Sequence, residues 1–487
     1  MHFKIFITFK KNIENCFMYL RSSILLLLSI LFNISGSSQT NAHTEDSLML
    51  KEIYNEALEN GHAYEDLRSL CKDVGARLSG SVSAEMAVQW GYQTLSKYNF
   101  DTVYLQEIQV PHWERGTKEN AYYSDADGKI NKVNILALGG SVPTNGIMTG
   151  EIVMFKNREA LQKASNKEIE GKIVFISQPM DQKMINTFRA YGVCYPIRGY
   201  GAIDATKKGA KAVIIRSLSL SEHEHPHTGT MQYEEGLNKI PAAALSTKDA
   251  TALEKLMNST KDKVMFHFEM DCKVLPDKKS HNVIAELKGT VNPNQIITFG
   301  GHLDSWDIGE GAHDDGAGIV HTMEALRILK VLNYKPNNTL RVVFFMNEEN
   351  GNMGGKTYAK KAKESNENHI LAIESDRGGF SPRGFSVDGN QKHLELIQSF
   401  TPLFKPYLLH HFEKGYGGVD IMPLKNEFEN IGLIGFVPDS QRYFDFHHNA
   451  NDVFENVNKR ELHLGAASIS ALLYLLDKHY REFDKTN

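Results

Sequence analysis

Short clusters of acidic and histidine residues recur in the second half of the chain. They are His302-Leu303-Asp304, His313-Asp314-Asp315, Glu348-Glu349, Glu374-Ser375-Asp376 and His447-His448. Imidazole and carboxylate ligands without thiolates favour zinc or a similar divalent ion, with one coordination position left open for water. Five such ligands are more than one catalytic zinc takes, and they suit two ions about 3.5–4 Å apart that share a bridging carboxylate. The sequence therefore predicts a centre with two Zn2+ per chain.

Two neighbouring carboxylates in these clusters are expected to have different tasks. Glu348 and Glu349 leave the end of an apolar run, where successive side chains point in different directions. One can reach a metal while the other faces the bound water, and a general base beside a metal-activated water is the chemistry of amide hydrolysis. Asp304 lies two residues beyond His302, and we expect its carboxylate to accept the free ring N–H of that histidine.

Three of the clusters follow apolar runs that are typical of buried strands, at 296–299, 340–346 and 370–373. Such runs indicate a parallel sheet covered by helices, and ligands bind beyond the carboxyl ends of its strands. Helical spacing is expected over 47–71, 84–98 and 461–480. We therefore predict an α/β fold in which a mostly parallel mixed sheet is flanked by helices.

The stretch from 135 to 270 has a different pattern. Short β-branched runs alternate there with Gly, Ser and Asn, which indicates a β-rich insert with its own small sheet. The catalytic domain is then expected in two parts, 39–134 and 271–487, and the second part carries the metal site. The insert also contains Glu222 to His227, which could bind a metal, although a solvated loop is the simpler interpretation.

The composition is that of an ordinary globular chain of 487 residues, with 41% hydrophobic and 23% charged positions. Its formal net charge is -5, so no basic surface for nucleic acid is expected. A basic start, an apolar run at 24–32 and small residues at 35–38 indicate a signal peptide over 1–38, whether translation starts at Met1 or Met18. The run is shorter than the roughly 20 residues of a membrane span, so we expect an extracytoplasmic protein, secreted or periplasmic, rather than one held by an uncleaved anchor.

The cysteines do not form a recognisable framework. Cys16 belongs to the expected signal, and the three others, Cys71, Cys194 and Cys272, are too widely spaced for a zinc motif and allow at most one disulfide. Asn258 and Asn337 lie in N-x-S/T sequons. The sequence is compatible with a homodimer but does not determine the oligomeric state.

Four segments together resemble the co-catalytic dizinc aminopeptidase family, and most closely its carboxypeptidase Q (plasma glutamate carboxypeptidase) branch. They are GGHLDSWDIGEGAHDDGAG (300–318), NEENGNMGG (347–355), ESDRGGF (374–380) and PDSQRYFDFHHNAND (438–452). The similarity extends over nearly all of the expected mature chain. One departure is His313, which stands before the aspartate of the third cluster where an apolar or amide residue is expected.

The resemblance assigns a role to each residue that matches a family motif. It implies that one zinc is bound by His302 and Asp376, the other by Glu349 and His448, with Asp314 as the bridge, Glu348 as the general base and Asp304 as the partner of His302. The last ligand belongs to an H-x-x-x-D pattern, which His448 and Asp452 satisfy. For this reason His448 is chosen over His447, and His313, Asp315, His447 and Glu374 are interpreted as neighbours.

The resemblance also extends to the insert and to the substrate. The segment 206–217 is similar to the protease-associated domain of this branch, and 415–420 is similar to its glycine-rich substrate-side loop, which makes Tyr416 and Asp420 candidate substrate-binding residues. Arg377 could orient a substrate carboxylate. Small peptides, above all dipeptides with free termini, are the implied substrates. A broader aminopeptidase, a glutaminyl cyclase with one zinc and a non-catalytic receptor-like member of the fold are the alternatives.

Overall fold

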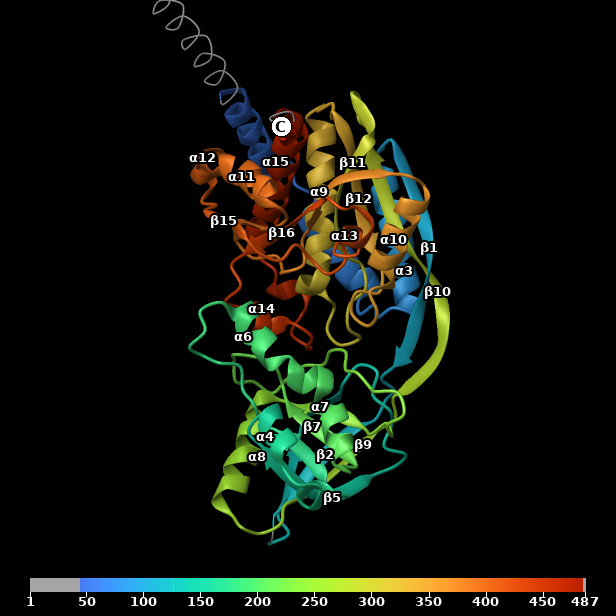
Figure 1. Ribbon diagram of the computed structural model, residues 1–487, viewed down its shortest axis with the longest axis vertical. Coiled ribbons are helices and arrows are strands. Elements are labelled where there is room, and N and C mark those ends of the chain that lie inside the picture. Colours follow the sequence, from blue (N-terminus) through green and yellow to red (C-terminus); the bar gives the residue numbers. More distant parts are fainter. Residues whose placement is uncertain (1–43, 126, 485–487) are drawn as a thin grey trace, which may run out of the picture. The chain divides into compact units, whose positions relative to one another are not determined.

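The described part of the computed structural model comprises residues 44–125 and 127–484 (Figure 1). The expected signal peptide, residues 1–38, lies outside the described residues. The chain divides into two compact units, 1–52 and 53–487, and the second unit contains both sheets and every candidate site residue. Within the described residues, no helix has the length and apolar character that a membrane crossing requires.

The first sheet has eight strands and is mixed, as the apolar runs predict. Its strands lie in the order β1 (Thr102–Glu114), β10 (Lys273–Leu287), β12 (Asn338–Phe345), β11 (Asn292–His302), β13 (Asn368–Glu374), β16 (Gly432–Pro438), β14 (Pro382–Asp388) and β15 (His411–Lys414). The four strands β12, β11, β13 and β16 run parallel to one another. Every residue of β12 is buried, which explains its near-continuous apolar run.

Helices cover both faces of this sheet. Phe344 of β12 faces α3 (Val82–Lys97), where its ring lies 6.5 Å from that of Trp90. Phe345, the next residue, faces α10 (Met353–Glu364), and its ring lies 5.6 Å from Tyr358. Adjacent strand residues point to opposite faces, so these two helices lie on opposite sides.

The remaining helices around this sheet are set by the same apolar patterns. Helix α9 (Ala317–Val331) is buried along almost its whole length and packs against both β11 and α15 (Lys459–Asp484). The helix expected over 47–71 is interrupted at Gly61 and His62, after which the chain forms α2 (Ala63–Ser69). A Cβ at position 61 would lie 2.2 Å from the carbonyl oxygen of Ala57, so the chain needs glycine at this break.

The second sheet also has eight strands, and all of them come from residues 119–270. Their order is β3 (Ile130–Val133), β2 (Glu119–Ser124), β9 (Met265–Met270), β5 (Met148–Phe155), β6 (Ile173–Ile176), β7 (Ala212–Arg216), β8 (Ala242–Leu245) and β4 (Ile135–Ala137). The expected domain boundary at residue 135 falls between β3 and β4, so two strands of this sheet precede it. Alternate residues of β6 pack against α7 (Pro196–Lys207) and α8 (Thr247–Ser259), on opposite faces.

The loop after β11 joins the two sheets. Trp306 of this loop is buried in the core of the second sheet, with its ring 6.4 Å from that of Trp113. Next to it, Arg115 forms an ion pair of 2.6 Å with Asp307 and one of 3.0 Å with Glu119. The chain that leaves His302 is therefore held by the core of the second sheet and by residues at the junction of β1 and β2. Three short elements complete this region: the π-helical turn η2 (Ala312–Gly316), α6 (Thr187–Cys194) and α14 (Tyr443–Phe446).

We predict that Gly139→Ala lowers the free energy of unfolding by about 1–3 kcal/mol, because overpacking a filled core displaces its neighbours. A Cβ at this position would lie 1.9 Å from the buried ring of Trp306. Chemical denaturation measures the effect. Gly192→Ala in α6 is the control, because its Cβ would have no atom of the described residues within 4 Å, and it should keep or slightly raise stability. Equal stability of Gly139→Ala and the parent chain would show that this packing is not tight.

Candidate metal centre

Five side chains from separate segments meet at one edge of the first sheet. His302 is the last residue of β11, Glu349 lies in the turn after β12, and Asp376 lies in the loop after β13. Asp314 lies in η2, before α9, and His448 follows α14. Because the parallel strands end at the same edge, the residues that follow them come together there. The structure thus brings together all five ligands that the sequence suggests.

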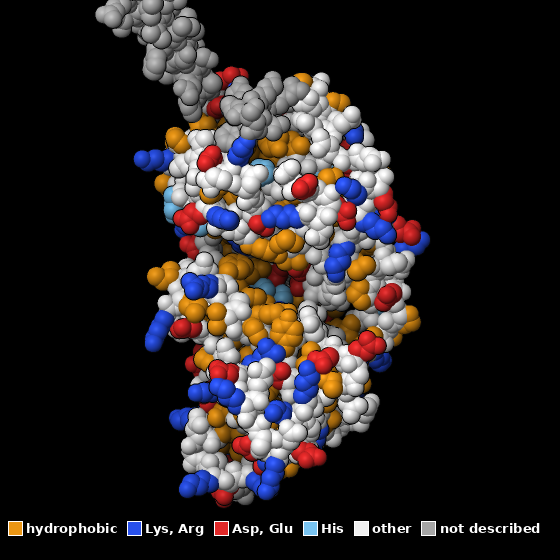
Figure 2. Space-filling view, in the orientation of Figure 1, with side chains coloured by type: hydrophobic (Ala, Val, Ile, Leu, Met, Phe, Trp, Pro, Cys, Tyr) orange, Lys and Arg blue, Asp and Glu red, His pale blue; other side chains and the backbone are white. Residues whose placement is uncertain are grey.

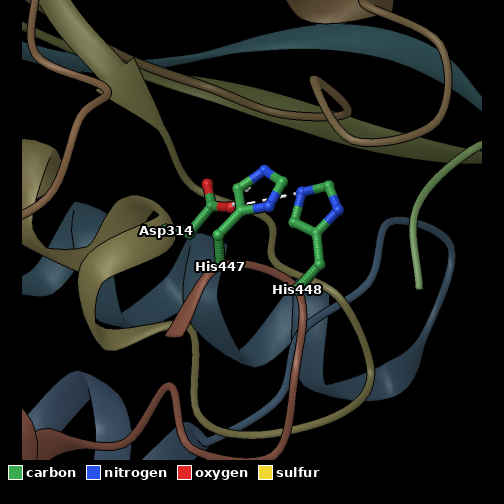
Figure 3. Close-up of side chains that lie close together, drawn as sticks. All are labelled: Asp314, His447 and His448. Atoms are coloured by element: carbon green, nitrogen blue, oxygen red, sulfur yellow. Dashed lines mark ion pairs between the residues drawn. The ribbon is translucent and has the colours of Figure 1, made fainter. Parts of the chain in front are cut away.

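Asp314 lies between two groups of these side chains. One of its carboxylate oxygens lies 3.1 Å from Nε2 of His302, and the other lies 3.2 Å from Nε2 of His448. His302 Nε2 is also 3.5 Å from Asp376, and His448 Nε2 is 3.1 Å from Glu349. Figure 3 shows the Asp314 carboxylate facing the rings of the two successive histidines. An acid with one oxygen toward each group is placed as a bridge between two ions would be.

The donor set fits a pair of divalent ions. Candidate ligand atoms of His302, Asp314 and Glu349 lie within 4.8 Å of one another, as do those of His302, Asp315 and Asp376. Oδ2 of Asp314 and Oε1 of Glu349 are buried and lack a hydrogen-bond partner among the described residues. Buried carboxylate oxygens require a partner, and imidazole with carboxylate is a set that zinc accepts.

The electrostatics of the site are dominated by buried acids. Burial raises the pKa of Glu348 well above its usual range, and the charges of Asp376 and Glu349 raise it further, although His302 opposes them. Burial likewise raises the pKa of Glu349 and of Asp376. Burial would also raise the pKa of Asp314, but a hydrogen bond from His302 and the nearby charge of His448 outweigh it and hold this pKa well below its usual range. Such a crowd of acids is stable as carboxylates only with cations beside it.

The two candidate histidine ligands differ in their outer contacts. Nδ1 of His302 lies 2.9 Å from the main-chain carbonyl oxygen of Asp304, whereas the Asp304 carboxylate is 3.9 Å from that nitrogen. The ring N–H therefore donates to the main chain, and the expected hydrogen bond to the carboxylate is absent. The carboxylate is fully buried and accepts the main-chain N–H groups of residues 347, 348 and 349, at 2.7, 3.1 and 3.4 Å. Asp304 thus fixes the turn that carries Glu348 and Glu349.

Two further carboxylates hold the main chain of the site. Asp452 accepts the N–H groups of His313 at 2.7 Å and of Asp314 at 3.1 Å, which fixes η2. Glu374 accepts three consecutive N–H groups, from residues 419, 420 and 421, at 2.8–3.0 Å. Neither pattern can be recognised from sequence spacing, because the donors lie 45 to 139 positions away from the acids.

The histidines that the sequence left aside have different positions. His313 stacks on Phe380 at 4.3 Å and accepts the N–H of Gly379, so it belongs to the packing around the site. His447 does enter the site: its ring stacks on that of His448 at 3.5 Å, and its Nε2 lies 3.7 Å from Asp314. In the sequence, the only sign that His447 belongs to the site was its position next to His448.

A cavity of about 820 Å³ opens onto the candidate ligands. In Figure 2 a hollow faces the viewer, with hydrophobic, acidic and histidine side chains gathered in it. Its wall includes Phe188, Tyr191 and Arg198 of the insert, and the sequence pattern did not identify these three residues. These residues lie on helices whose spacing carries no sign of a site.

The three candidate substrate-binding residues are placed differently. Arg377 and Tyr416 line the cavity. The Arg377 guanidinium donates to the Tyr416 carbonyl oxygen at 3.1 Å and lies over the ring of Phe188. Asp420, the last residue of the 415–420 loop, is fully buried, and neither of its carboxylate oxygens has a hydrogen-bond partner within the described part of the chain.

We predict that Asp304→Asn lowers the free energy of unfolding by about 1–3 kcal/mol. The amide nitrogen would replace one of the two carboxylate oxygens and cannot accept, so at least one buried main-chain N–H group loses its acceptor. Denaturant unfolding of the metal-free protein measures this loss. The matched control is Asp181→Asn, an exposed residue whose carboxylate accepts the N–H of Lys183, and its effect should stay within about 0.5 kcal/mol. Equal effects of the two substitutions would contradict the assigned role of Asp304.

Comparisons with known proteins identify the family. The model of peptidase family M28 matches residues 282–473. Carboxypeptidase Q of Homo sapiens is 35% identical over 428 residues, which cover 87% of this chain and 86% of that protein, and carboxypeptidase Q of Mus musculus is 34% identical over 417 residues, 85% of each.

Solved structures show the same fold. A peptidase M28 precursor from Shewanella amazonensis has a TM-score of 0.85 and 31% identity, covering 89% of this chain and 97% of its own. A zinc aminopeptidase from Bacillus subtilis, 19% identical, has a TM-score of 0.59 and covers 86% of this chain and 94% of its own. With these relatives and this site, the chain belongs to peptidase family M28 and is a metallopeptidase.

Proposed function

We propose that the protein is an exported dizinc peptidase that hydrolyses small peptides, above all dipeptides with free termini. The observation that carries this proposal is the position of Asp314, with one carboxylate oxygen toward His302 and the other toward His448. The carboxypeptidase Q relatives, which align over most of this chain, support a peptidase that acts at chain ends.

The proposed ligands follow from the two groups around Asp314. His302 and Asp376 would hold one zinc ion, Glu349 and His448 the other, and Asp314 would bridge them. Bound zinc would supply Lewis acidity toward the scissile carbonyl and would make a water molecule more acidic. Four of the five proposed ligands, His302, Asp314, Glu349 and His448, are buried, so solvent would screen the charge of the ions only weakly.

Glu348 is the proposed general base. It lines the cavity and is only partly buried, unlike its neighbour Glu349. The bond from its N–H to Asp304 fixes the main chain on which its side chain turns toward the cavity. From there its carboxylate would take a proton from the attacking water and deliver it to the leaving amine.

The cavity supports a small substrate. A space of about 820 Å³ suits a short peptide, and the helices α6 and α7 form one of its walls. Arg377 lies in the cavity wall, where its guanidinium would match the free carboxylate of a short peptide. Arg377 and Tyr416 are the proposed contacts with substrate. Asp420, buried at the end of the 415–420 loop, would help to position that loop.

We also propose a signal peptide and a domain organisation for the chain. Residues 1–38 would be a signal peptide, which makes the mature enzyme extracytoplasmic. The β-rich insert of residues 135–270 would be a protease-associated domain, with β2 and β3 completing its sheet. The parts on either side, 39–134 and 271–487, would form the catalytic domain.

We predict that the purified enzyme carries two zinc ions per chain, and that Glu348→Gln keeps both while its kcat falls by about 10²–10⁴-fold, because the general base is lost. Metal content by mass spectrometry and dipeptide hydrolysis by ninhydrin assay measure the two effects. Glu364→Gln, at an exposed position of α10, is the control and should be fully active. Normal turnover by Glu348→Gln would refute its assignment as the base.

We predict that free dipeptides are cleaved with higher kcat/KM than N-acetylated or C-amidated dipeptides, by roughly 10- to 100-fold. This is the range expected when one hydrogen bond to a charged group is lost. A panel that also includes tri- and tetrapeptides measures the preference. Equal cleavage of longer chains would indicate the broader aminopeptidase, and indifference to blocked amines would rule out recognition of the free amino end.

A further inference from the structure

A loop of the insert lies directly against the proposed zinc ligand His448. The N–H of Thr228 donates to the carbonyl oxygen of His448 at 3.0 Å. In return, Nδ1 of His448 lies 3.3 Å from the carbonyl oxygen of Thr228. Thr228 is fully buried. The two residues, 220 positions apart, therefore hold each other through main chain and ring.

The contacts of His448 define the task of each ring nitrogen. Nε2 faces the oxygens of Glu349 and Asp314, at 3.1 and 3.2 Å, so it is the nitrogen available to a metal. Nδ1 must then carry the proton, and its acceptor is the Thr228 carbonyl oxygen. A metal-ligating histidine commonly donates its second ring N–H in this way, and that acceptor fixes both the tautomer and the angle of the ring.

Arg198 holds the same carbonyl from the other side. Its Nη1 lies 3.2 Å from the Thr228 carbonyl oxygen and 3.3 Å from Nδ1 of His448. A guanidinium can only donate, and Nδ1 carries the ring proton when Nε2 faces the metal position, so this N–H donates to the carbonyl oxygen. Nη2 donates to the hydroxyl of Tyr191 at 2.6 Å. The guanidinium lies over the rings of Tyr191 and Tyr195 and is almost fully buried. It forms no ion pair with any carboxylate of the described residues. Burying a cation without a counter-ion costs free energy, and hydrogen bonds offset part of that cost. Here the hydrogen bonds of Arg198 fix one carbonyl group and one hydroxyl group at the site.

The loop leaves room for this guanidinium only because the next residue is glycine. Gly229 has φ +133°, and a Cβ there would lie 2.3 Å from Cζ and Nη1 of Arg198. The loop is fixed from its far side as well, since the Thr228 hydroxyl donates to Ala137 at 2.8 Å and the N–H of Gly139 donates to Gly229 at 3.0 Å. The Thr228 carbonyl oxygen is thus held at a defined point.

We propose that the insert completes the metal centre, with Arg198 as a positioning residue that holds the Thr228 carbonyl where it orients the imidazole of His448. This inference rests on the proposed role of His448 as a zinc ligand. The zinc affinity of the site formed by Glu349 and His448 then depends on the insert, which supplies no metal ligand of its own. The zinc affinity of the site formed by His302 and Asp376 does not depend on the insert.

Zinc affinity tests the proposal separately from turnover. Arg198→Lys and Arg198→Met are titrated against a chromophoric chelator as full-length holoenzymes. One of the two zinc ions should bind roughly 10–100-fold more weakly in both variants, and the other should be unchanged. Lysine keeps the charge but cannot bond the carbonyl and the hydroxyl at once, so it should not rescue affinity. Arg216→Met is the matched control, a partly buried insert arginine bonded to Thr251, and it should bind zinc normally.

A second variant tests the same contact with the arginine retained. Gly229→Ala should displace the guanidinium and weaken the same zinc ion. The visible absorption of the Co2+-substituted protein should change in all three variants, which a role in folding alone would not produce. Variants that fold and bind both ions like the parent chain would overturn the inference, and so would tighter binding in Arg198→Met alone, which would indicate simple charge repulsion. If an Arg198 variant does not fold, Gly229→Ala decides.

The outcome distinguishes this inference from the proposed function. A parent chain without tightly bound zinc, or without hydrolysis that depends on Glu348, would contradict the proposed function itself. A parent chain that has both, together with variants of normal zinc affinity, would contradict only the role of Arg198.

Discussion

The crowding of buried carboxylates around Asp314 is the constraint on which the rest of the structure depends. Asp314, Glu349 and Asp376 face the imidazoles of His302, His447 and His448, and Asp315 accepts the main-chain N–H of His302. Negative charges at such distances in a dry site repel one another strongly, and burial favours their protonated forms. Divalent cations remove this conflict, so the fold is arranged to keep a set of acids that are stable as carboxylates only when metal is bound.

A second set of acids makes this arrangement rigid. Asp304, Glu374 and Asp452 direct their carboxylates to main-chain N–H groups, and each fixes the loop that carries a candidate ligand or lines the cavity. Loops that follow strands are otherwise the most variable part of an α/β fold. The acids of the site thus divide into those that face the metal position and those that hold the main chain, and a sequence pattern of Asp and Glu does not distinguish them.

The sequence predicted what depends on local pattern. The apolar runs located β11, β12 and β13, and the residues just beyond them are the ones that meet at the sheet edge. It failed where the exact orientation of a side chain or a partner distant in the sequence is decisive. The ring N–H of His302 bonds a main-chain carbonyl instead of the Asp304 carboxylate. The cavity wall includes helices of the insert, and β2 pairs with β9 more than a hundred residues later. These contacts depend on tertiary packing, which a short segment of sequence does not predict.

The two candidate histidine ligands show why the insert contacts the site. His302 ends a central strand, where neighbouring strands on both sides hold its main chain. His448 follows a four-residue helix and has φ +62°, a left-handed conformation that histidine seldom adopts and that persists only where the surroundings hold it. No strand of the first sheet passes through this segment. The loop at Thr228 supplies the missing support, so the ligand with the weakest local scaffold is the one that the insert holds.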